Sequence, residues 1–563
     1  MTAEFSPALI LLFGALGIPF LKGVLRIAYM LALPALTLAY ILTLPVGEMG
    51  QAELFDLGLT TLRVDRLSLL FGYIFMIAAV LTVIYSIHLR DTVQHVAGLI
   101  YISGALGAVF AGDLVTFFIC WEIMAVASVF LIWASRNLEA YHAGMRYLLV
   151  HVGSGVLLLA GVLMNYRETG SLAFEALDFA LPGTPLIFVA FGIKCAFPML
   201  HSWLQDAYPN GTITGTVLLS SFTTKVAVYA LARSFAGVDI LIPIGVTMAA
   251  FPIFYAVIEN DLRRVLAYSL NNQLGFMVVG VGIGTDLALN GAVAHAFADI
   301  LFKGLLFMSM GAVLFRVGTA KGSELGGLYK SMPWTTGFCL VGAASISAFP
   351  LFSGFVTKSM IMSAAMEEGY FWSWVVLLFA SAGVFHHAGI KIPYFAFFAH
   401  DSGKRCKEAP LNMLIAMGIA ALGCIAIGCL PGLFYSLLPY GAEYHPYTLD
   451  HVVAQLQLLF FSALAFALLM RTGIYPPELR SINLDFDWVF RRLGLALVVG
   501  TGKTSERAWK AFAYQIFRAV RYFADGLHTY HGPSGLLARS WQTSNMAFWT
   551  SVVLAAYLLF LYL

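Results

Sequence analysis

Residues 190–206 read Ala-Phe-Gly-Ile-Lys-Cys-Ala-Phe-Pro-Met-Leu-His-Ser-Trp-Leu-Gln-Asp, an apolar run interrupted by a lysine, a proline and a histidine. A lysine at the centre of a bilayer costs about 2.5–3.5 kcal/mol, so it usually faces a wet or protein-lined interior. Pro198 follows Lys194 by four residues, and its ring removes the helical hydrogen bond to the Lys194 carbonyl. His201 would lie roughly two turns beyond Lys194 on the same helical face. The stretch predicts a broken helix on a proton path; the alternative is a kinked helix whose lysine reaches the membrane surface.

The same pattern recurs later in the chain. Residues 346–358 read Ile-Ser-Ala-Phe-Pro-Leu-Phe-Ser-Gly-Phe-Val-Thr-Lys, so Ala348-Phe349-Pro350 repeats Ala196-Phe197-Pro198 and Lys358 is a second intramembrane lysine. Paired, proline-interrupted apolar segments in two halves of a chain are typical of inverted-repeat transporters. We therefore expect two inverted repeats with a charged axis between them.

The composition is that of a polytopic membrane protein, because 60% of the 563 residues are hydrophobic and 11% are charged. Runs long enough to span a bilayer predict an all-α bundle of about sixteen transmembrane helices, of which the seventh and the twelfth are broken. No folded soluble domain fits before residue 471. The runs lie at about 6–21, 24–46, 67–88, 96–112, 113–135, 140–165, 184–205, 214–236, 240–258, 263–284, 286–315, 335–365, 372–398, 409–438, 451–470 and 546–563.

Lysine and arginine predict the orientation of the bundle. Connections after odd-numbered helices carry most of these residues, and by the positive-inside rule they are cytoplasmic. Both chain termini are then expected on the non-cytoplasmic side. The basic residues of this set are Lys22, Arg26, Arg90, Arg136, Arg263, Arg264, Arg316, Lys321, Lys330, Lys404, Arg405 and Lys407.

Residues 471–545 are rich in basic residues and amphipathic from about 483 to 530, which predicts a helix that lies along the membrane or the protein's flank. Gly500-Thr501-Gly502-Lys503-Thr504-Ser505 resembles a phosphate loop, but Leu497 stands where its first glycine is required, so nucleotide binding is rejected. The predicted divisions are N-terminal helices 1–95, a first repeat 96–236, a second repeat 240–398, C-terminal core helices 399–470, the cytoplasmic-side segment 471–545 and a final transmembrane helix 546–563.

Ionisable residues inside the predicted helices exceed what packing requires. Glu122 is the only acid in a run of about twenty residues, and a functional pair with Lys194 is favoured over a structural ion pair. His295, Asp299 and Lys303 are spaced by four, so they line one face of the eleventh helix; a polar seam between helices is the alternative. The remaining candidates are Arg146, His151, Lys225, Lys358 and Lys391.

These groups suggest a mechanism of proton transfer. Burial favours the neutral amine of a lysine, and an approaching carboxylate favours the ammonium ion. A lysine that alternately gains and loses a carboxylate partner therefore gains and loses a proton. The sequence shows no nucleophile triad, phosphate loop or metal-ligand cluster, so we expect a transporter subunit without cofactor or metal rather than an enzyme.

The sequence resembles the antiporter-like membrane subunits shared by Mrp-type Na⁺/H⁺ antiporters, respiratory complex I and membrane-bound hydrogenases, and it is most similar to the D-type subunits of Mrp antiporters. The match covers roughly residues 60–435. It is carried by Asp113-Leu-Val-Thr-Phe-Phe-Ile-Cys-Trp-Glu122, Ile193-Lys194 through Asp206, Thr224-Lys225 through Arg233, Arg264-Val-Leu-Ala-Tyr-Ser with Gln273-Leu-Gly, His295 through Lys303, and Gly354-Phe-Val-Thr-Lys358.

The resemblance implies a role for each matched residue. Glu122 and Lys194 would form the switch of the first half-channel, and Lys225 would link it to His295 and Lys303. Lys358 would close the path, with His201, Asp299, Lys391 and Arg146 as secondary members. The last segment and final helix resemble the lateral helix and last span of the longest complex I subunit.

Two positions depart from the family pattern. Asp299 stands where a second histidine is usual, which changes the central relay or offers an oxygen ligand to a cation. Gln205 replaces a proline in Trp203-Leu-Gln-Asp-Ala207 and removes one helix breaker.

The resemblance implies a proton-translocating subunit of a multisubunit monovalent cation (Na⁺)/H⁺ antiporter in the bacterial cytoplasmic membrane, assembled with other Mrp- or complex I-like membrane subunits. Three alternatives use a similar subunit: the membrane arm of a complex I-like enzyme, that of a hydrogenase, and an inorganic-carbon accumulation complex. A lone carrier and a structural scaffold are disfavoured, because relatives are assembled side by side and a scaffold needs few buried charges.

Overall fold

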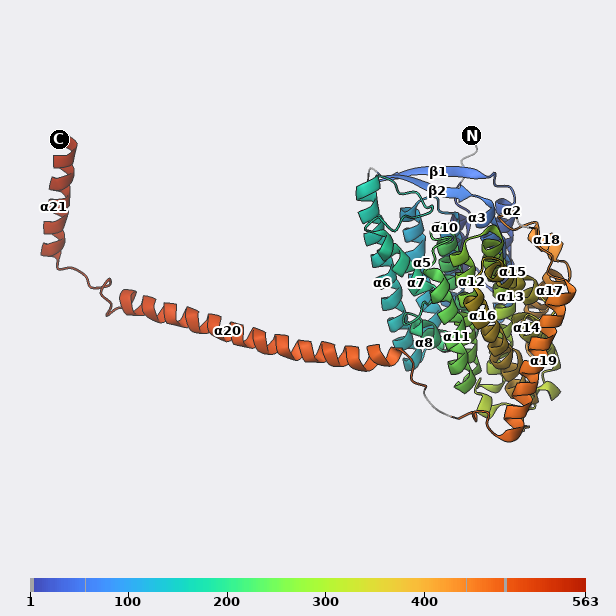
Figure 1. Ribbon diagram of the computed structural model, residues 1–563. Helices are drawn as coiled ribbons and strands as arrows, with labels where there is room; N and C mark the ends of the chain where they lie inside the picture. Colours follow the sequence, from blue (N-terminus) through green and yellow to red (C-terminus); the bar gives the residue numbers. More distant parts are fainter. Residues whose placement is uncertain (1–4, 56, 442, 480–482) are drawn as a thin grey trace. The chain divides into compact units, whose positions relative to one another are not determined.

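The computed structural model describes residues 5–55, 57–441, 443–479 and 483–563 (Figure 1). It divides into two compact units, of which the first extends to Asn483 and the second comprises Leu484–Leu563. The first unit is a helical bundle, and the second is made of helices alone in the part described.

The α-helices of the first unit follow the predicted apolar runs in order. They are α1 (Ala8–Ala15), α2 (Gly23–Ile41), α3 (Arg66–Ser86), α4 (Thr92–Phe110), α5 (Leu114–Trp133), α6 (Leu138–Thr169), α7 (Thr184–Lys194), α8 (Ser202–Asn210), α9 (Ile213–Ser221), α10 (Thr223–Ser234), α11 (Leu241–Ile258), α12 (Leu262–Ile283), α13 (Asp286–Val317), α14 (Pro333–Ile346), α15 (Ser353–Glu367), α16 (Phe371–Val384), α17 (Leu411–Cys429), α18 (Pro431–Tyr435) and α19 (Leu449–Thr472). Shorter elements are the 3₁₀ turns η1 (Ile18–Phe20), η2 (Gly322–Glu324) and η3 (Leu328–Lys330) and the π-helical segments η4 (Phe385–Lys391) and η5 (Tyr394–Phe398).

The predicted all-α membrane bundle is confirmed. Within the described residues, 12 helices are long and apolar enough to cross a membrane. The other four predicted spans are helical but short, broken or polar: α1 with η1, α7 with α8, α12, and α14 with α15. Helix α12 carries the buried amides of Asn271, Asn272 and Gln273, which explains its lower hydropathy.

The two breaks have the same backbone conformation, which supports the predicted repeat. Ala196 (φ 60°) and Met199 (φ 70°) adopt left-handed conformations after α7, and Ala348 (φ 56°) and Leu351 (φ 75°) do so after α14. Left-handed backbone costs non-glycine residues about 1–2 kcal/mol each. The phenylalanine of each Ala-Phe-Pro also makes the same hydrogen bond. The Phe197 and Phe349 amides each donate to the carbonyl five residues earlier, at 2.9 and 3.0 Å. Each Ala-Phe-Pro therefore specifies the same turn.

The chain runs through the two breaks in opposite directions. Helix α7 leads into its break from the edge of the bundle that carries the β-hairpin, whereas α14 leads into its break from the opposite edge (Figure 1). In the first pair α7 lies nearer the hairpin than α8, and in the second pair α15 lies nearer than α14. This arrangement is that of inverted repeats.

A β-hairpin was not expected from the sequence. Strands β1 (Gly47–Leu54) and β2 (Leu57–Val64) pair antiparallel, with Gly47 opposite Val64. The Thr60 amide donates to the Asp113 carboxylate at 2.9 Å, and the Gly112 amide donates to the Thr60 carbonyl at 2.9 Å. The hairpin thus anchors the start of α5, the helix that carries Glu122. The strands are short and lie between long apolar runs, so the hydrophobic pattern of the sequence did not distinguish them from a loop.

Polar side chains begin most of the long helices. A capping side chain accepts a backbone N–H of the first turn, which otherwise lacks a helical partner. In lipid such unsatisfied groups cost several kcal/mol, so these caps fix where each span starts. The caps are Asp65 for α3, Asp91 for α4, Asp113 for α5, Asn137 for α6, Asp261 for α12, Thr285 for α13 and Thr448 for α19.

The second unit contains the π-helical segment η6 (Val489–Gly494), the 37-residue helix α20 (Leu495–His531) and α21 (Thr543–Tyr562). The predicted amphipathic stretch is thus a helix, and α21 is the predicted final span. Residues 500–505 lie within α20, so in this structure they form a helix and not a phosphate-binding loop.

Candidate functional site

Lys194 is the last residue of α7, at the break that the sequence predicts. Its side chain is fully buried, and its Nζ donates to the Trp121 carbonyl at 2.6 Å. The ammonium also lies 4.0 Å from the centre of the Trp121 ring, which adds a cation–π attraction. The Trp121 indole donates to Ser154, whose hydroxyl donates to the Ala190 carbonyl, so α5, α6 and α7 hold the site together.

Glu122, the next residue of α5, interacts electrostatically with Lys194. Among the described residues its buried Oε1 has no hydrogen-bond partner, and no carboxylate lies within ion-pair distance of Lys194. In this structure the lysine therefore bonds the carbonyl beside Glu122 and not the predicted acid itself. Glu122 and Lys194 are thus within each other's electrostatic field without a direct ion pair.

The Glu122 carboxyl group rests against Gly155 of α6. A Cβ atom on Gly155 would overlap this carboxyl group, so only glycine leaves it room. Glu122 also lines an apolar groove of about 780 Å³ that is formed chiefly by α4 and α5. Thr92 and Val96 of α4 and Ile119 of α5 are among the other residues that line it. Glu122 thus lies between the buried lysine and the lateral surface of the bundle.

Gly155→Ala is expected to displace the Glu122 carboxyl group and to lower proton transport about tenfold without loss of assembly. The matched control is Gly153→Ala on the same helix, because a Cβ there meets nothing within 4 Å. The measurement is the initial rate of proton movement in vesicles, scaled to the amount of assembled complex. Equal rates for the two variants would contradict the placement of Glu122 in the switch.

Lys225 and Asp299 form an ion pair that joins the two repeats. Lys225 lies just after the break between α9 and α10, and its Nζ is 2.6 Å from Asp299 Oδ2 of α13. Both side chains are fully buried, and the ammonium also donates to the Ser220 carbonyl at 2.9 Å. The residue that departs from the family pattern is thus the counter-charge of the linking lysine.

His295 and Lys303 lie on the same helix as Asp299 and are buried as well. The His295 ring bonds Thr357 of α15 through Nδ1 at 2.9 Å and Gln273 of α12 through Nε2 at 3.0 Å. Lys303 Nζ donates to Ser269 of α12 at 2.8 Å. The predicted stripe therefore faces α12 and α15, and its members bond to different partners.

Lys358 lies on α15, directly after Thr357. Its Nζ donates to the Ile346 carbonyl at 3.2 Å, at the end of α14, and lies 4.8 Å from the centre of the Phe276 ring. Lys194 is the last residue of α7, before the first break, and Ile346 is the last residue of α14, before the second break. Ile346 is therefore the counterpart of Lys194 in the second repeat. The two lysines are therefore not equivalent positions of the repeat: one precedes its break and the other follows it.

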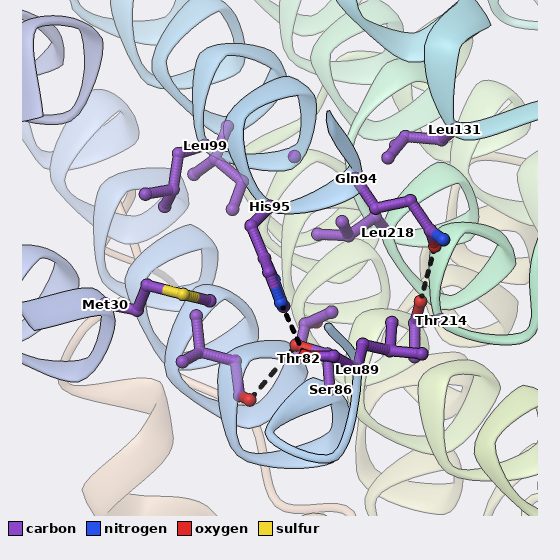
Figure 2. Close-up of a pocket in the computed structure, with 13 residues that line it drawn as sticks. Met30, Thr82, Ser86, Leu89, Gln94, His95, Leu99, Leu131, Thr214 and Leu218 are labelled. Carbon is purple, nitrogen blue, oxygen red and sulfur yellow. Dashed lines mark hydrogen bonds between the residues drawn. The ribbon is translucent and has the colours of Figure 1, made fainter. Parts of the chain in front are cut away.

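A small cavity of about 30 Å³ lies between α2, α3, α4 and α9 (Figure 2). His95 points into it and its Nε2 lies 3.2 Å from the Leu89 carbonyl, while Thr214 of α9 bonds Gln94 at 3.2 Å. A cavity of this size holds one or two water molecules. Helix α9, which lines the cavity through Thr214 and Leu218, also carries the Ser220 carbonyl that accepts from Lys225.

Comparison with known proteins assigns the family. The sequence profile described as "NADH:quinone oxidoreductase/Mrp antiporter, TM" matches residues 111–397, about half of the chain. The chain belongs to this family. All six principal site residues, from Glu122 to Lys358, lie inside the matched range.

Relatives with different names share this family. Hydrogenase-4 component B of Escherichia coli (strain K12) is 28% identical over 66% of this chain and 63% of its own length. The D-type subunit of the Na⁺/H⁺ antiporter of Alkalihalophilus pseudofirmus (strain ATCC BAA-2126 / JCM 17055 / OF4) is 30% identical over 53% of this chain and 64% of its own. The matched segments thus span just under two thirds of each relative.

Among solved structures, a chain of the membrane-bound sulfane sulfur reductase, an archaeal respiratory membrane complex, has the same fold. The TM-score is 0.70 at 23% sequence identity, and the match covers 98% of this chain and 99% of that chain. The likeness therefore extends beyond the family's matched range to the C-terminal helices.

Of the secondary residues, Asp299 lies in the central row, whereas His201, Arg146 and Lys391 lie outside it. His201 directly precedes α8, after the break, so its predicted position on one helical face with Lys194 is wrong. Its ring packs on Phe251 of α11, with 4.6 Å between centroids. Arg146 pairs with Asp206 through two bonds of 2.7 and 3.0 Å and is partly exposed, which ties α6 to α8.

Lys391, the last of the secondary residues, ends η4 and bonds the C-terminal end of α11. Its ammonium donates to the carbonyls of Ala256, Val257 and Glu259 at 3.2, 2.7 and 2.6 Å and pairs with Glu478 at 2.9 Å.

The partners of the site were only partly indicated by the sequence. The Trp121 carbonyl is a backbone group, for which a side-chain pattern gives no signal. Ser269, Gln273 and Thr357 lie in motifs that match the family, but their pairing with Lys303 and His295 depends on helix packing.

Proposed function

We propose that the chain is the proton-translocating subunit of a multisubunit monovalent cation (Na⁺)/H⁺ antiporter. The observation that carries this proposal is the buried Lys225–Asp299 pair, because it connects the ionisable groups of the first repeat with those of the second. A buried ion pair gives little net stability and is weak evidence for a purely structural role. Costly charges inside a membrane protein are by default functional.

The first repeat supplies a switch made of Glu122 and Lys194. With Lys194 bonded to the Trp121 carbonyl, Glu122 lacks its counter-charge; movement of the ammonium toward the carboxylate forms the pair. Pair formation favours the charged lysine, and pair separation in a buried site favours the neutral amine. Each cycle of this switch therefore loads one proton onto Lys194 and releases it.

The central groups pass the charge between the repeats. Asp299 is 2.6 Å from Lys225 and also attracts Lys303 and Lys358, so one carboxylate serves three lysines. When Lys225 is neutral, Asp299 is free to stabilise a proton on Lys303. His295, bonded between α12 and α15, connects this group to Thr357 and thus to Lys358.

Lys358 ends the path at the second break. Non-helical backbone at membrane depth is tolerated where it is buried in protein or lines a wet cavity, and the Ile346 carbonyl that Lys358 bonds is such a group. On the other side, the cavity of Figure 2 supplies water next to α9 on the way to Lys225. Protons thus reach the central row through α9 and leave it through the break before α15.

The proposal includes an assembly in the bacterial cytoplasmic membrane. The apolar groove beside Glu122 is lined by exposed side chains of Val93, Val126 and Phe130, and a neighbouring membrane subunit would cover it and complete the switch. The proposal keeps the orientation expected from the positive-inside rule, with the basic connections on the cytoplasmic side and both termini on the other side. Arg146 would position α8 through Asp206, and His201 would line the path below it.

A second candidate is the proton-pumping arm of a redox-driven complex. It is favoured by the match to a respiratory membrane complex, which covers 98% of this chain and therefore its second unit. The relative named hydrogenase-4 component B points the same way. In that function the proton path would be unchanged and the driving reaction would occur in a partner.

The experiment that separates these functions uses inverted vesicles from an antiporter-deficient bacterium that contain the chain with its partner subunits. Respiration builds a pH gradient, and Na⁺, Li⁺ or K⁺ is then added. Collapse of the gradient by Na⁺ is the result expected of an antiporter. If no cation collapses the gradient in vesicles with an assembled complex, but an electron donor drives proton uptake, the chain belongs to a redox-driven complex and the antiporter proposal is wrong.

A further inference from the structure

The span formed by α16, η4 and η5 carries two adjacent histidines that the proposed path does not use. Its helix changes to π-helical geometry from Phe385 to Lys391, within a span of 28 residues. Such segments are rare and occur frequently at functional sites, because they redirect side chains. Gly389 brings this segment close to the second break: a Cβ there would overlap the Ser347 hydroxyl and the Phe385 ring.

His387 is fully buried at the centre of this segment. Among the described residues neither of its ring nitrogens has a hydrogen-bond partner, although the Gly383 carbonyl lies near the ring. A buried polar group left unpaired costs about 1–3 kcal/mol, and each such group in a folded protein calls for an explanation. An imidazole with two free nitrogens accepts a proton at one and donates a proton from the other.

The ring lies in the electrostatic field of two buried lysines. It interacts electrostatically with Lys303, the inner lysine of the proposed path, and with Lys391 and His386 on its own segment. His386 faces outward from this group and stacks on Tyr475, with ring centroids 5.4 Å apart and planes at 12°. His387 therefore shares the electrostatic field of the central row through Lys303 and that of the end of its own segment through Lys391.

Beyond His387, acidic groups lead to the edge of the bundle. Lys391 pairs with Glu478 at 2.9 Å, and only 6% of the Glu478 side chain is exposed. Glu478 interacts with Glu259 at the end of α11, and Glu259 lies 3.8 Å from Arg264, whose side chain is 32% exposed. Because the connection at Glu259 follows an odd-numbered span, this edge is the predicted cytoplasmic one.

Lys391 is held too firmly to carry the proton itself. Its ammonium makes three bonds to the carbonyls of Ala256, Val257 and Glu259 in addition to the Glu478 pair. These contacts fix the cation at the C-terminal end of α11, where helix carbonyls favour positive charge. Lys391 therefore holds a carboxylate inside the bundle and acts as a positioning residue.

We propose that His387 and Glu478, with Lys391 as the positioning residue, form a second proton branch that links Lys303 to the cytoplasmic edge of the second repeat. A proton from the edge binds Glu478, passes to one ring nitrogen of His387, directly or through water, and leaves from the other nitrogen to the neutral amine of Lys303. The reverse sequence releases a proton. This inference rests on the proposed function, because it supplies protons to the same central row.

The test uses the complete complex in inverted vesicles, driven by the cation or electron donor that moves protons in the wild type. His387→Phe keeps the ring volume but cannot carry a proton, and it is expected to lower the rate at least about tenfold. Glu478→Gln is expected to lower it several-fold. His400→Phe, at an exposed histidine just past the same span, is the matched control and is expected to stay within about twofold.

A relay also predicts a larger solvent isotope effect. When His387→Asn slows proton delivery, this step limits the rate, and the ratio of rates in H₂O and D₂O rises above that of the wild type; a merely structural defect would leave the ratio unchanged. The polar variant also serves if His387→Phe fails to assemble. Wild-type rates in an assembled His387 variant would overturn the branch alone, whereas a wild-type complex that moves no protons would overturn the proposed function and the branch with it.

Discussion

Asp299→Ala is expected to destabilise the protein by about 3–5 kcal/mol and to abolish proton transport. That range is the usual cost of removing one member of a buried ion pair, because the other charge is left without compensation. Lys225 and Asp299 are both 0% exposed and 2.6 Å apart, so water does not take over the role of the carboxylate. The measurements are the apparent melting temperature of the detergent-purified complex and the proton flux in vesicles.

The double variant Lys225→Met/Asp299→Leu separates stability from transport. Replacing both members of a buried pair by apolar residues of similar size is often neutral or stabilising. We therefore expect a melting temperature near that of the wild type and no proton flux. The control is Lys330→Met, which removes a half-exposed pair with Asp401 and should change stability by about 0–1 kcal/mol. Transport in the stable double variant would show that the pair is only structural.

Lys303→Met is expected to reduce proton flux to less than about a tenth while the melting temperature does not fall. The lysine is fully buried and has one neutral hydrogen-bond partner, Ser269; it is attracted by Asp299, which already pairs with Lys225, and repelled by Lys225 and Lys358. Methionine fills a similar volume and removes the like-charge repulsion. Asp299→Ala is thus expected to lower the melting temperature and Lys303→Met is not, although both variants lose proton flux. This combination is specific to a charged relay.

Ser269→Ala is the milder companion of this variant. It removes the hydroxyl that accepts from Lys303 at 2.8 Å but leaves the lysine in place, so a partial loss of flux is expected. A normal flux in Lys303→Met would exclude Lys303 from the path and would leave His295 as the route to Lys358.

The features predicted correctly from the sequence depend on local physics. Pro198 and Pro350 cannot continue a helix, so the breaks were visible as residue types at a fixed spacing, and the repeated Ala-Phe-Pro gives the same left-handed turn twice. Apolar runs likewise marked the spans, and the amphipathic pattern marked α20. Burial of Lys194, Lys225 and Lys303 follows from their place in such runs.

The partners of these residues depend on tertiary packing and were not predictable. Lys194 was expected to pair with Glu122, but it bonds the backbone carbonyl of the preceding residue, which no side-chain pattern indicates. Asp299 was recognised as a departure from the family, yet its pairing with Lys225 requires α10 to lie against α13. The expected helical spacing of His201 failed because the break before α8 removes the regular geometry.

The measurement that tests the central claim most directly compares the wild type with Lys194→Ala in the vesicle assay. Both complexes must be assembled to the same level, and Lys404→Ala, at a partly exposed lysine, serves as the control for loss of a lysine. We expect Na⁺ to collapse the respiration-built pH gradient in the wild type and in Lys404→Ala but not in Lys194→Ala. A Lys194→Ala complex that collapses the gradient at the wild-type rate would contradict the proton path through the buried row.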